Sequence, residues 1–196
     1  RLSRTMADVP EELLPPYDGI KLHDVRMVKS ERDAADALAA LLSSDVLGFD
    51  TESKPTFAKG ESSTGPHLVQ LATDDAAYLF QIGAAPAIDV LREVLESAAI
   101  LKVGFGLTDD LRRLRSKLGI DTNNVLDLST ALRRGERNTL GAKTAVARFF
   151  GQRLQKSKKI TTTNWSLPRL TEKQILYAAD DAHVALRIYR RWRADS

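Results

Sequence analysis

The sequence of 196 residues contains no cysteine, only three histidines and no long apolar run. Without cysteine, disulfides, thiolate metal ligands and cysteine nucleophiles are excluded, and a reducing compartment such as the cytoplasm is expected. With so few histidines, a bound metal ion would have to be held by carboxylates. No apolar run approaches the roughly 18 residues of a membrane-spanning helix, and the first twenty residues lack the apolar centre of a secretory signal. The sequence therefore predicts a cytoplasmic protein that does not contact a membrane.

Charge is divided unevenly along the chain, although the formal net charge is only +3. Residues 1–99 carry 9 Lys and Arg against 17 Asp and Glu, whereas residues 100–196 carry 20 against 9. The stretch 133–160 has nine basic residues and a single acidic one, Glu136. Such a patch suits a polyanion, with nucleic acid as the first candidate. A solvated basic surface is the alternative.

The order of apolar segments predicts a mixed α/β sheet with helices on both faces. Residues 1–24, interrupted by three prolines, are expected to be peripheral, and residues 25–196 to form one domain. Capping patterns at residues 30–33 and 171–174 predict helix starts, and 151–170 reads as a long loop. Strands are expected near 25–28, 46–49, 67–73, 77–82, 100–105 and 125–126, and helices near 30–42, 88–96, 108–118 and 171–192, with two or three short helices between 128 and 150.

Two acidic residues close a buried strand. Asp50 and Glu52 follow the apolar run Val46–Phe49, and residues i and i+2 of a strand point to the same face. Two neighbouring carboxylates repel each other unless a positive group neutralises them. A divalent cation such as Mg²⁺ or Mn²⁺ would do so. The alternative is a strand that ends in solvent.

Two more acidic residues fall on apolar helix faces. Asp110 shares a side with Leu107 and Leu114, whereas Asp109 lies on the wet side. Asp181 lies in a stripe with Tyr177, and its neighbour Asp180 is expected to be exposed. Each has a structural alternative, a favourable helix-dipole position for Asp110 and a Tyr–Asp contact for Asp181. Four inward acids on three separate elements together favour two bound divalent cations.

Three segments carry a family resemblance. FDTES at 49–53, VGFGLTDDLRRL at 103–114 and LTEKQILYAADDA at 170–182 resemble the three motifs of the DEDD superfamily of 3′–5′ exonucleases. The likeness is closest to the tyrosine subclass, with its ribonuclease D and Werner-type exonuclease domains, and it covers about residues 25–193. Thr163–Ser166 and Leu68–Thr73 resemble further segments of the Werner-type branch. The resemblance implies a ribonuclease H-like fold, with a mixed five-stranded sheet flanked by helices.

The resemblance also implies the site. The catalytic and metal-binding acids map onto Asp50, Glu52, Asp110 and Asp181, and the subclass tyrosine maps onto Tyr177. The sister subclass would need a histidine where Leu176 stands. One departure is Ser53-Lys54-Pro55, which lacks the usual aromatic residue before proline. The chain lacks the helical domains that follow the catalytic domain of ribonuclease D, so it resembles the small stand-alone members of the bacterial type.

The implied reaction is hydrolysis of the terminal phosphodiester of DNA or RNA from a free 3′ end, which releases nucleoside 5′-monophosphates. Two cations, Mg²⁺ or Mn²⁺, would flank the scissile phosphate, with Asp50 as the bridging ligand. Tyr177 would orient the attacking water, because a phenol is too weak an acid to act readily as a base at neutral pH. The alternatives are a catalytically silent nucleic-acid-binding or scaffold protein on the same fold and the proofreading domain of a polymerase.

Weaker expectations concern the substrate. Aromatic side chains stack on bases, and basic or amide side chains contact phosphates. Core packing or a solvated loop is the alternative for each. The candidate substrate-binding residues are Leu68, Gln70, Phe105, Asn164, Trp165, Lys156, Lys158 and Lys159, with Phe57 as a further stacking candidate.

Overall fold

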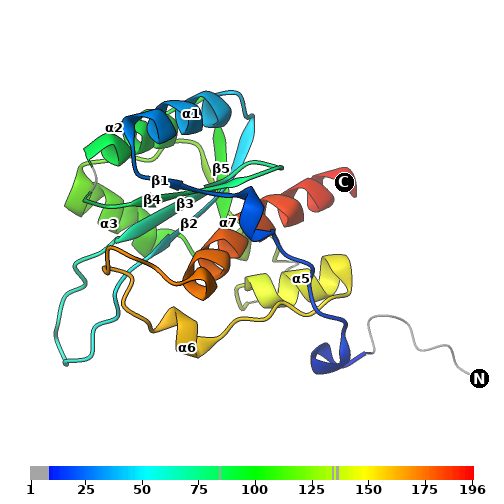
Figure 1. Cartoon of the computed structure of the whole chain (residues 1–196). Coiled ribbons are helices and arrows are strands. Elements are labelled where there is room, and N and C mark those ends of the chain that lie inside the picture. The colour runs from blue at the N-terminus through cyan, green and yellow to red at the C-terminus, as the bar shows by residue number, and fades with distance from the viewer. Residues whose placement is uncertain (1–8, 84, 134, 136) are drawn as a thin grey trace, which may run out of the picture.

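The computed structural model describes residues 9–83, 85–133, 135 and 137–196. A central sheet lies between two layers of helices (Figure 1). This is the mixed α/β architecture that the segment order predicts. The strands are β1 (Val25–Val28), β2 (Val46–Glu52), β3 (Leu68–Ala72), β4 (Ala77–Gln81), β5 (Leu101–Gly104) and β6 (Val125–Asp127).

The sheet has six strands in the order β1-β4-β3-β2-β5-β6, which match the six predicted segments and exceed by one the five that the resemblance implies. β2, β3 and β4 form an antiparallel meander, while β1 joins β4, β5 joins β2 and β6 joins β5 in parallel. The two edge strands are short, with four residues in β1 and three in β6. The longest strand, β2, lies inside the sheet, where neighbours on both sides hold its backbone.

Helices form where the sequence predicts them. The capping boxes at Ser30–Asp33 and Thr171–Gln174 are both present, and Gly119 ends its helix in the left-handed conformation. The interval 151–170, predicted as loop, contains one short helix. The helices are α1 (Glu31–Leu42), α2 (Ala85–Leu95), α3 (Thr108–Leu118), α4 (Leu128–Ala131), α5 (Ala142–Phe150), α6 (Lys158–Thr161) and α7 (Glu172–Ala194).

Alternation along β2 divides its side chains between the two faces. Leu47 and Phe49 pack with the cluster that includes α1, α2 and α3. Val46 belongs to the opposite cluster, formed with α5 and α7. The even-numbered residues of β2 therefore face α7, and this rule also places Asp50 and Glu52.

Residues 15–20 run along α7 as a strap. Tyr17 donates its backbone N–H to the carbonyl of Arg153 (2.9 Å), and Arg153 donates to the carbonyl of Pro15 (2.8 Å). The backbone N–H of Ile20 donates to Oδ1 of Asp180 on α7 (2.7 Å). The strap is thus bonded to the loop after α5 and to the middle of α7. The division into a peripheral segment 1–24 and a domain 25–196 stays a prediction.

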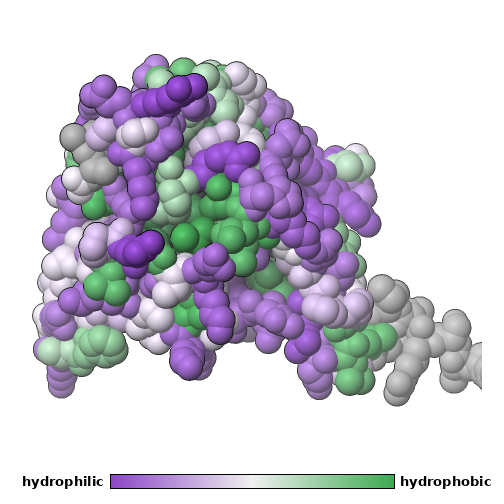
Figure 2. Space-filling model, viewed as in Figure 1, coloured by the Kyte–Doolittle hydropathy of each residue, from purple (hydrophilic) through white to green (hydrophobic). Residues whose placement is uncertain are grey.

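Hydrophilic side chains cover most of the face in Figure 2, around an apolar area near its middle, where the sheet and α7 lie in Figure 1. Among the described residues, no helix has both the length and the apolar character needed to cross a lipid bilayer.

Candidate active site

β2 carries two acidic side chains on the face that packs against α7. Glu52 is buried, with 8% of its surface exposed, and Asp50 is half-buried. Gln70, on the neighbouring strand β3, donates from Nε2 to Oε1 of Glu52 (3.3 Å) and to the carbonyl of Ala178 on α7 (3.1 Å). This fully buried amide holds the Glu52 carboxyl against both elements.

A glycine lets α7 approach this strand closely. A Cβ atom on Gly48 would lie 1.9 Å from the carbonyl oxygen of Ala182, so a larger residue would force the helix away from the sheet. Because Asp181 directly precedes Ala182, the close crossing brings its carboxyl beside those of β2. The position of the acids in FDTES relative to α7 therefore depends on Gly48, which precedes this motif.

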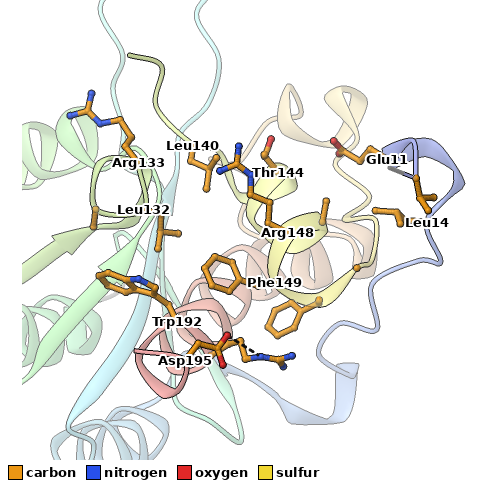
Figure 3. Close-up of a pocket in the computed structure, with 16 residues that line it drawn as sticks. Glu11, Leu14, Leu132, Arg133, Leu140, Thr144, Arg148, Phe149, Trp192 and Asp195 are labelled. Atoms are coloured by element: carbon orange, nitrogen blue, oxygen red, sulfur yellow. Dashed lines mark ion pairs between the residues drawn. The ribbon is translucent and has the colours of Figure 1, made fainter. Parts of the chain in front are cut away.

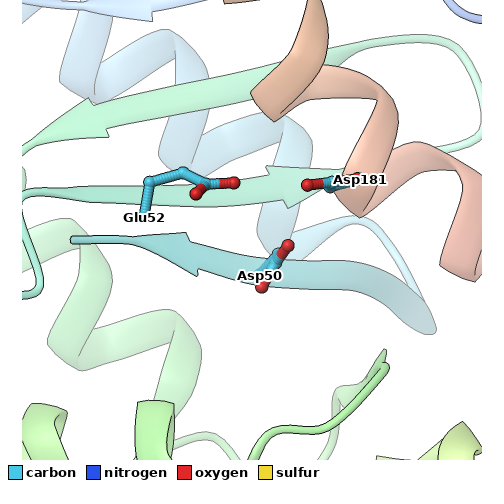
Figure 4. A group of neighbouring side chains, drawn as sticks. All are labelled: Asp50, Glu52 and Asp181. Carbon is cyan, nitrogen blue, oxygen red and sulfur yellow. The ribbon is translucent and has the colours of Figure 1, made fainter. Parts of the chain in front are cut away.

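Three carboxyls meet in the space between β2 and α7 (Figure 4). Asp50, Glu52 and Asp181 each offer an oxygen, and these atoms all lie within 4.8 Å of one another. The Asp181 side chain is only 8% exposed. The structure thus brings together residues from the first and third sequence motifs, 129 positions apart.

This crowding changes the acidity of the group. Burial, with repulsion from Asp50 and Asp181, raises the pKa of Glu52 to about 10. Burial, with repulsion from Asp181 and Asp110, raises the pKa of Asp50 well above its usual value. Burial also raises the pKa of Asp181, although Lys156 acts in the opposite direction. Without a bound cation, burial and crowding therefore favour the protonated forms of these carboxyls.

One ammonium group enters this cluster. The Nζ atom of Lys156 lies 3.3 Å from Oδ1 of Asp181. Burial opposes its charge, but attraction to Asp181 and Asp50 prevails and raises the pKa of Lys156. The sequence predicts that Lys156 contacts substrate phosphates, as do Lys158 and Lys159. The structure separates Lys156 from those two lysines, because the loop after α5 turns it into the acidic site.

Asp110 approaches the cluster from α3. It accepts a hydrogen bond from Oγ1 of Thr51, the residue between the two acids of β2. It is half-buried, whereas Asp109 is exposed and pairs with Arg112 (2.9 Å), as the helix pattern predicts. Asp110 also contributes to the raised pKa of Asp50. It therefore lies beside the cluster, outside the group of three.

Tyr177 stands one helical turn before Asp181. Its hydroxyl shares a hydrogen bond with Oγ1 of Thr161 on α6 (2.6 Å). Its ring packs against that of Trp165, with the two ring centroids 6.1 Å apart. The Nε1 of Trp165 donates a hydrogen bond to the carbonyl of Thr161 (3.1 Å). Burial, with the charge of Asp181, raises the pKa of Tyr177 to about 12, so the phenol stays protonated.

A model of the 3′–5′ exonuclease family matches residues 25–194 of this chain. The chain belongs to the 3′–5′ exonuclease family. The matched range contains every residue of the acidic cluster and Tyr177. Members of this DEDD group depend on divalent metal ions, and relatives named 3′–5′ exonucleases are hydrolases.

Individual relatives agree with this assignment. The mouse bifunctional 3′–5′ exonuclease/ATP-dependent helicase WRN is 31% identical over 150 residues, which cover 75% of this chain and 11% of that protein. A 3′–5′ exonuclease of Arabidopsis thaliana is 27% identical, over 74% of this chain and 51% of its own length. The crystal structure of the Aedes aegypti Nibbler EXO domain superposes with a TM-score of 0.76 at 25% identity, covering 89% of this chain and 90% of that domain. The chain thus spans about half or less of these two curated relatives.

The acidic site fits a divalent cation. Its ligand atoms are hard carboxylate oxygens, which suit Mg²⁺ and Mn²⁺. Among the described residues, these three carboxyls have one ammonium group, that of Lys156, as their ion-pair partner. A cation held by Asp50, Glu52 and Asp181 would relieve the repulsion that, together with burial, raises the pKa values of Asp50 and Glu52.

Several of the expected substrate-binding side chains lie in the core, and their contacts with a substrate stay predictions. Leu68 and Gln70 are fully buried, and Trp165 is 1% exposed. Leu68 and Trp165 pack in the core beneath α7, while Gln70 supports Glu52 and Trp165 supports Tyr177. Phe105 also packs against a core cluster, on the side of α5 and α7.

Other expected contacts stay predictions. Lys158 and Lys159 are exposed on α6, and Phe57 is 83% exposed in the loop after β2. Asn164 uses its Oδ1 to accept a hydrogen bond from the backbone of Ser166 (3.0 Å), which stabilises the turn before α7.

The neighbours of Asp181 differ from expectation. Asp180 is half-buried, because the strap covers it and Ile20 bonds to it, and burial raises its pKa to about 6. Gly19 explains the close fit, since a Cβ there would lie 2.3 Å from Oδ1 of Asp180. His183, two residues after Asp181, is half-buried, and its Nε2 shares a hydrogen bond with the carbonyl of Asp74 (3.1 Å). No local pattern in the sequence predicts that residues 15–20 lie along α7.

A cavity of about 1010 Å³ lies away from the acids, between residues 9–14, α5 and the end of α7 (Figure 3). Its wall combines apolar side chains such as Leu132, Phe149 and Trp192 with Arg133 and Arg148. It contains none of the clustered carboxyls. We therefore assign the chemistry to the acidic site.

The raised pKa of Glu52 predicts how pH affects the stability of the metal-free protein. The folded protein holds protons on Glu52 that the unfolded chain releases near pH 4.5, so the free energy of unfolding should fall as pH rises toward about 10. Burial lowers the pKa of Lys102 to about 8, and this shift makes the free energy of unfolding rise with pH. Wild type is therefore compared with Glu52→Gln, in which Lys102 is unchanged. In EDTA, the melting temperature of wild type should fall more between pH 7 and 9 than that of the variant. Equal slopes would contradict the expectation, and saturating Mg²⁺ should reduce the difference.

Proposed function

We propose that this chain hydrolyses the terminal phosphodiester of a nucleic acid strand, from a free 3′ end, with two divalent cations, and releases nucleoside 5′-monophosphates. The observation that carries the proposal is the convergence of Asp50, Glu52 and Asp181 within 4.8 Å, with the Tyr177 phenol one helical turn away. A nucleic acid substrate suits the basic second half of the chain. A cytoplasmic location stays a prediction from the absence of cysteine.

The protein side chains divide the work. Asp50, Glu52 and Asp181 would hold one cation, and Asp50 with Asp110 would hold the second. Bound cations supply a hydroxide at neutral pH and neutralise the charge that develops on the phosphate and the leaving 3′ oxygen. Tyr177, kept protonated, orients the attacking water by hydrogen bonding, and Thr161 fixes the direction of its hydroxyl.

The test is a comparison of short DNA and RNA strands labelled at the 3′ or the 5′ end. With Mg²⁺ or Mn²⁺, we expect 3′-labelled strands to release labelled mononucleotide at once and 5′-labelled strands to shorten stepwise. EDTA should abolish both. Binding of the strands without release of mononucleotides would instead assign the chain to the scaffold class.

Lys158 and Lys159 provide a separate prediction about substrate binding. Both are exposed on α6, so they should bind phosphates upstream of the cleaved bond and act equally on ground state and transition state. The double variant Lys158→Ala/Lys159→Ala should raise KM for long strands and leave kcat unchanged. The slope of log affinity for a single strand against log salt concentration should become shallower by roughly 0.7 for each phosphate that the variant no longer neutralises.

Substrate length supplies the control for this prediction. A dinucleotide has no phosphate upstream of the scissile one, so its KM should not change in the double variant. An unchanged salt slope on the long strand would show that these two lysines form only a solvated surface.

A further inference from the structure

Lys156 stands out because a lysine ammonium group occupies a carboxylate cluster suited to metal ions. Its Nζ lies 3.3 Å from Oδ1 of Asp181, yet 39% of the Lys156 side chain is exposed. The side chain therefore covers the acids from the outside, where a substrate would arrive. Lys158 and Lys159 follow within three residues but form part of the exposed surface of α6.

The loop that carries Lys156 is fixed at both ends. On one side, Arg153 is bonded to the strap through Pro15 and Tyr17, and Leu154 is buried with 5% of its surface exposed. On the other side, Ser157 caps α6 by accepting a hydrogen bond from the backbone of Ile160 (3.4 Å). The lysine backbone is thus held near the acids, while its long side chain keeps its rotational freedom.

The two charge states of the site place different demands on this side chain. Without cations, the ammonium stabilises Asp181. Once divalent cations occupy the same carboxyls, it loses that anion and is repelled by the new positive charge. The scissile phosphate is then the anion that lies within reach of a lysine anchored at this point.

We propose that Lys156 is a catalytic residue with two positions, a counter-ion of Asp181 in the metal-free site and a ligand of the scissile phosphate in the substrate complex. The second position rests on the proposed exonuclease function, whereas the first does not. A cation on a phosphoryl oxygen stabilises the charge that grows in the transition state. The role differs from that of Lys158 and Lys159, which should affect binding alone.

The test uses Lys156→Met, which keeps the length of the side chain and removes the charge. The matched control is Lys117→Met, which removes the same charge from the exposed end of α3. Titration calorimetry of Mn²⁺ without nucleic acid should show binding about 3- to 10-fold tighter in Lys156→Met and unchanged in the control. Unchanged Mn²⁺ affinity in both variants would overturn the counter-ion position.

The phosphate contact is measured without turnover. With Ca²⁺ in place of Mg²⁺, nucleoside 5′-monophosphates should bind about tenfold more weakly to Lys156→Met than to wild type. In Mg²⁺, kcat should fall about 10²-fold, and Lys156→Arg should recover most of both effects. Unchanged monophosphate binding and kcat would overturn the phosphate position, and a thermal melt checks that each variant is folded.

The two hypotheses fail in different ways. If wild type releases no mononucleotides, the proposed function fails, while the Mn²⁺ titration still decides the counter-ion position. If wild type is active and Lys156→Met is equally active, only the catalytic role of Lys156 is wrong.

Discussion

Replacement of Asp50 by asparagine should lower kcat by at least about 10³-fold in saturating Mg²⁺. The substitution keeps the shape of the side chain but removes the charge of the carboxyl that faces both Asp181 and Asp110. Asp181→Asn should have an effect of the same order, because it removes a ligand from the same group. Steady-state kinetics on a labelled strand, with the Mn²⁺ affinity of each variant, provide the measurement.

The matched control for these variants is Asp109→Asn. Asp109 lies next to Asp110 on α3, but it is exposed and pairs with Arg112, so its kcat should equal that of wild type. In EDTA, Asp50→Asn should melt at a higher temperature than wild type, because one of the mutually repelling buried carboxyls is gone. Wild-type turnover by Asp50→Asn would contradict the assignment of this cluster as the active site.

Local periodicity accounts for the parts of the site that the sequence predicts. The alternation of a strand places Asp50 and Glu52 on one face, and the helical repeat places Tyr177 and Asp181 on another. The structure brings these two faces together, as their shared inward direction implies. The capping boxes of α1 and α7 are local patterns too, and both are confirmed.

Long-range contacts explain what the sequence could not predict. Lys156 reaches the acids because the strap pairs with Arg153, a contact that joins residues more than 130 positions apart. Asp180 is covered for the same reason, since Ile20 lies 160 residues before it. Trp165 has an aromatic side chain of the kind that stacks on bases, yet it is buried because Tyr177 and the core beneath α7 surround it. No spacing within a single element encodes such placements.

The second large effect concerns Tyr177→Phe, which removes only one oxygen atom. The ring should keep its packing on Trp165, and the carboxyls should keep their cation affinity. A group that positions the attacking water contributes about 10²- to 10⁴-fold. We therefore expect kcat to fall by that factor, with KM and Mn²⁺ affinity nearly unchanged.

Two further variants separate the hydroxyl's chemistry from its structural role. Tyr189→Phe removes a hydroxyl from the same helix, away from the acids, and should leave kcat unchanged. Thr161→Val removes the partner that orients the Tyr177 hydroxyl, so kcat should fall less, by about tenfold, at unchanged Mn²⁺ affinity. If the hydroxyl only stabilised the fold, Tyr177→Phe would lower the melting temperature and leave kcat at the wild-type value. A fall in kcat at constant melting temperature, ordered Tyr177→Phe, Thr161→Val, Tyr189→Phe from largest to smallest, would assign the hydroxyl to the chemical step.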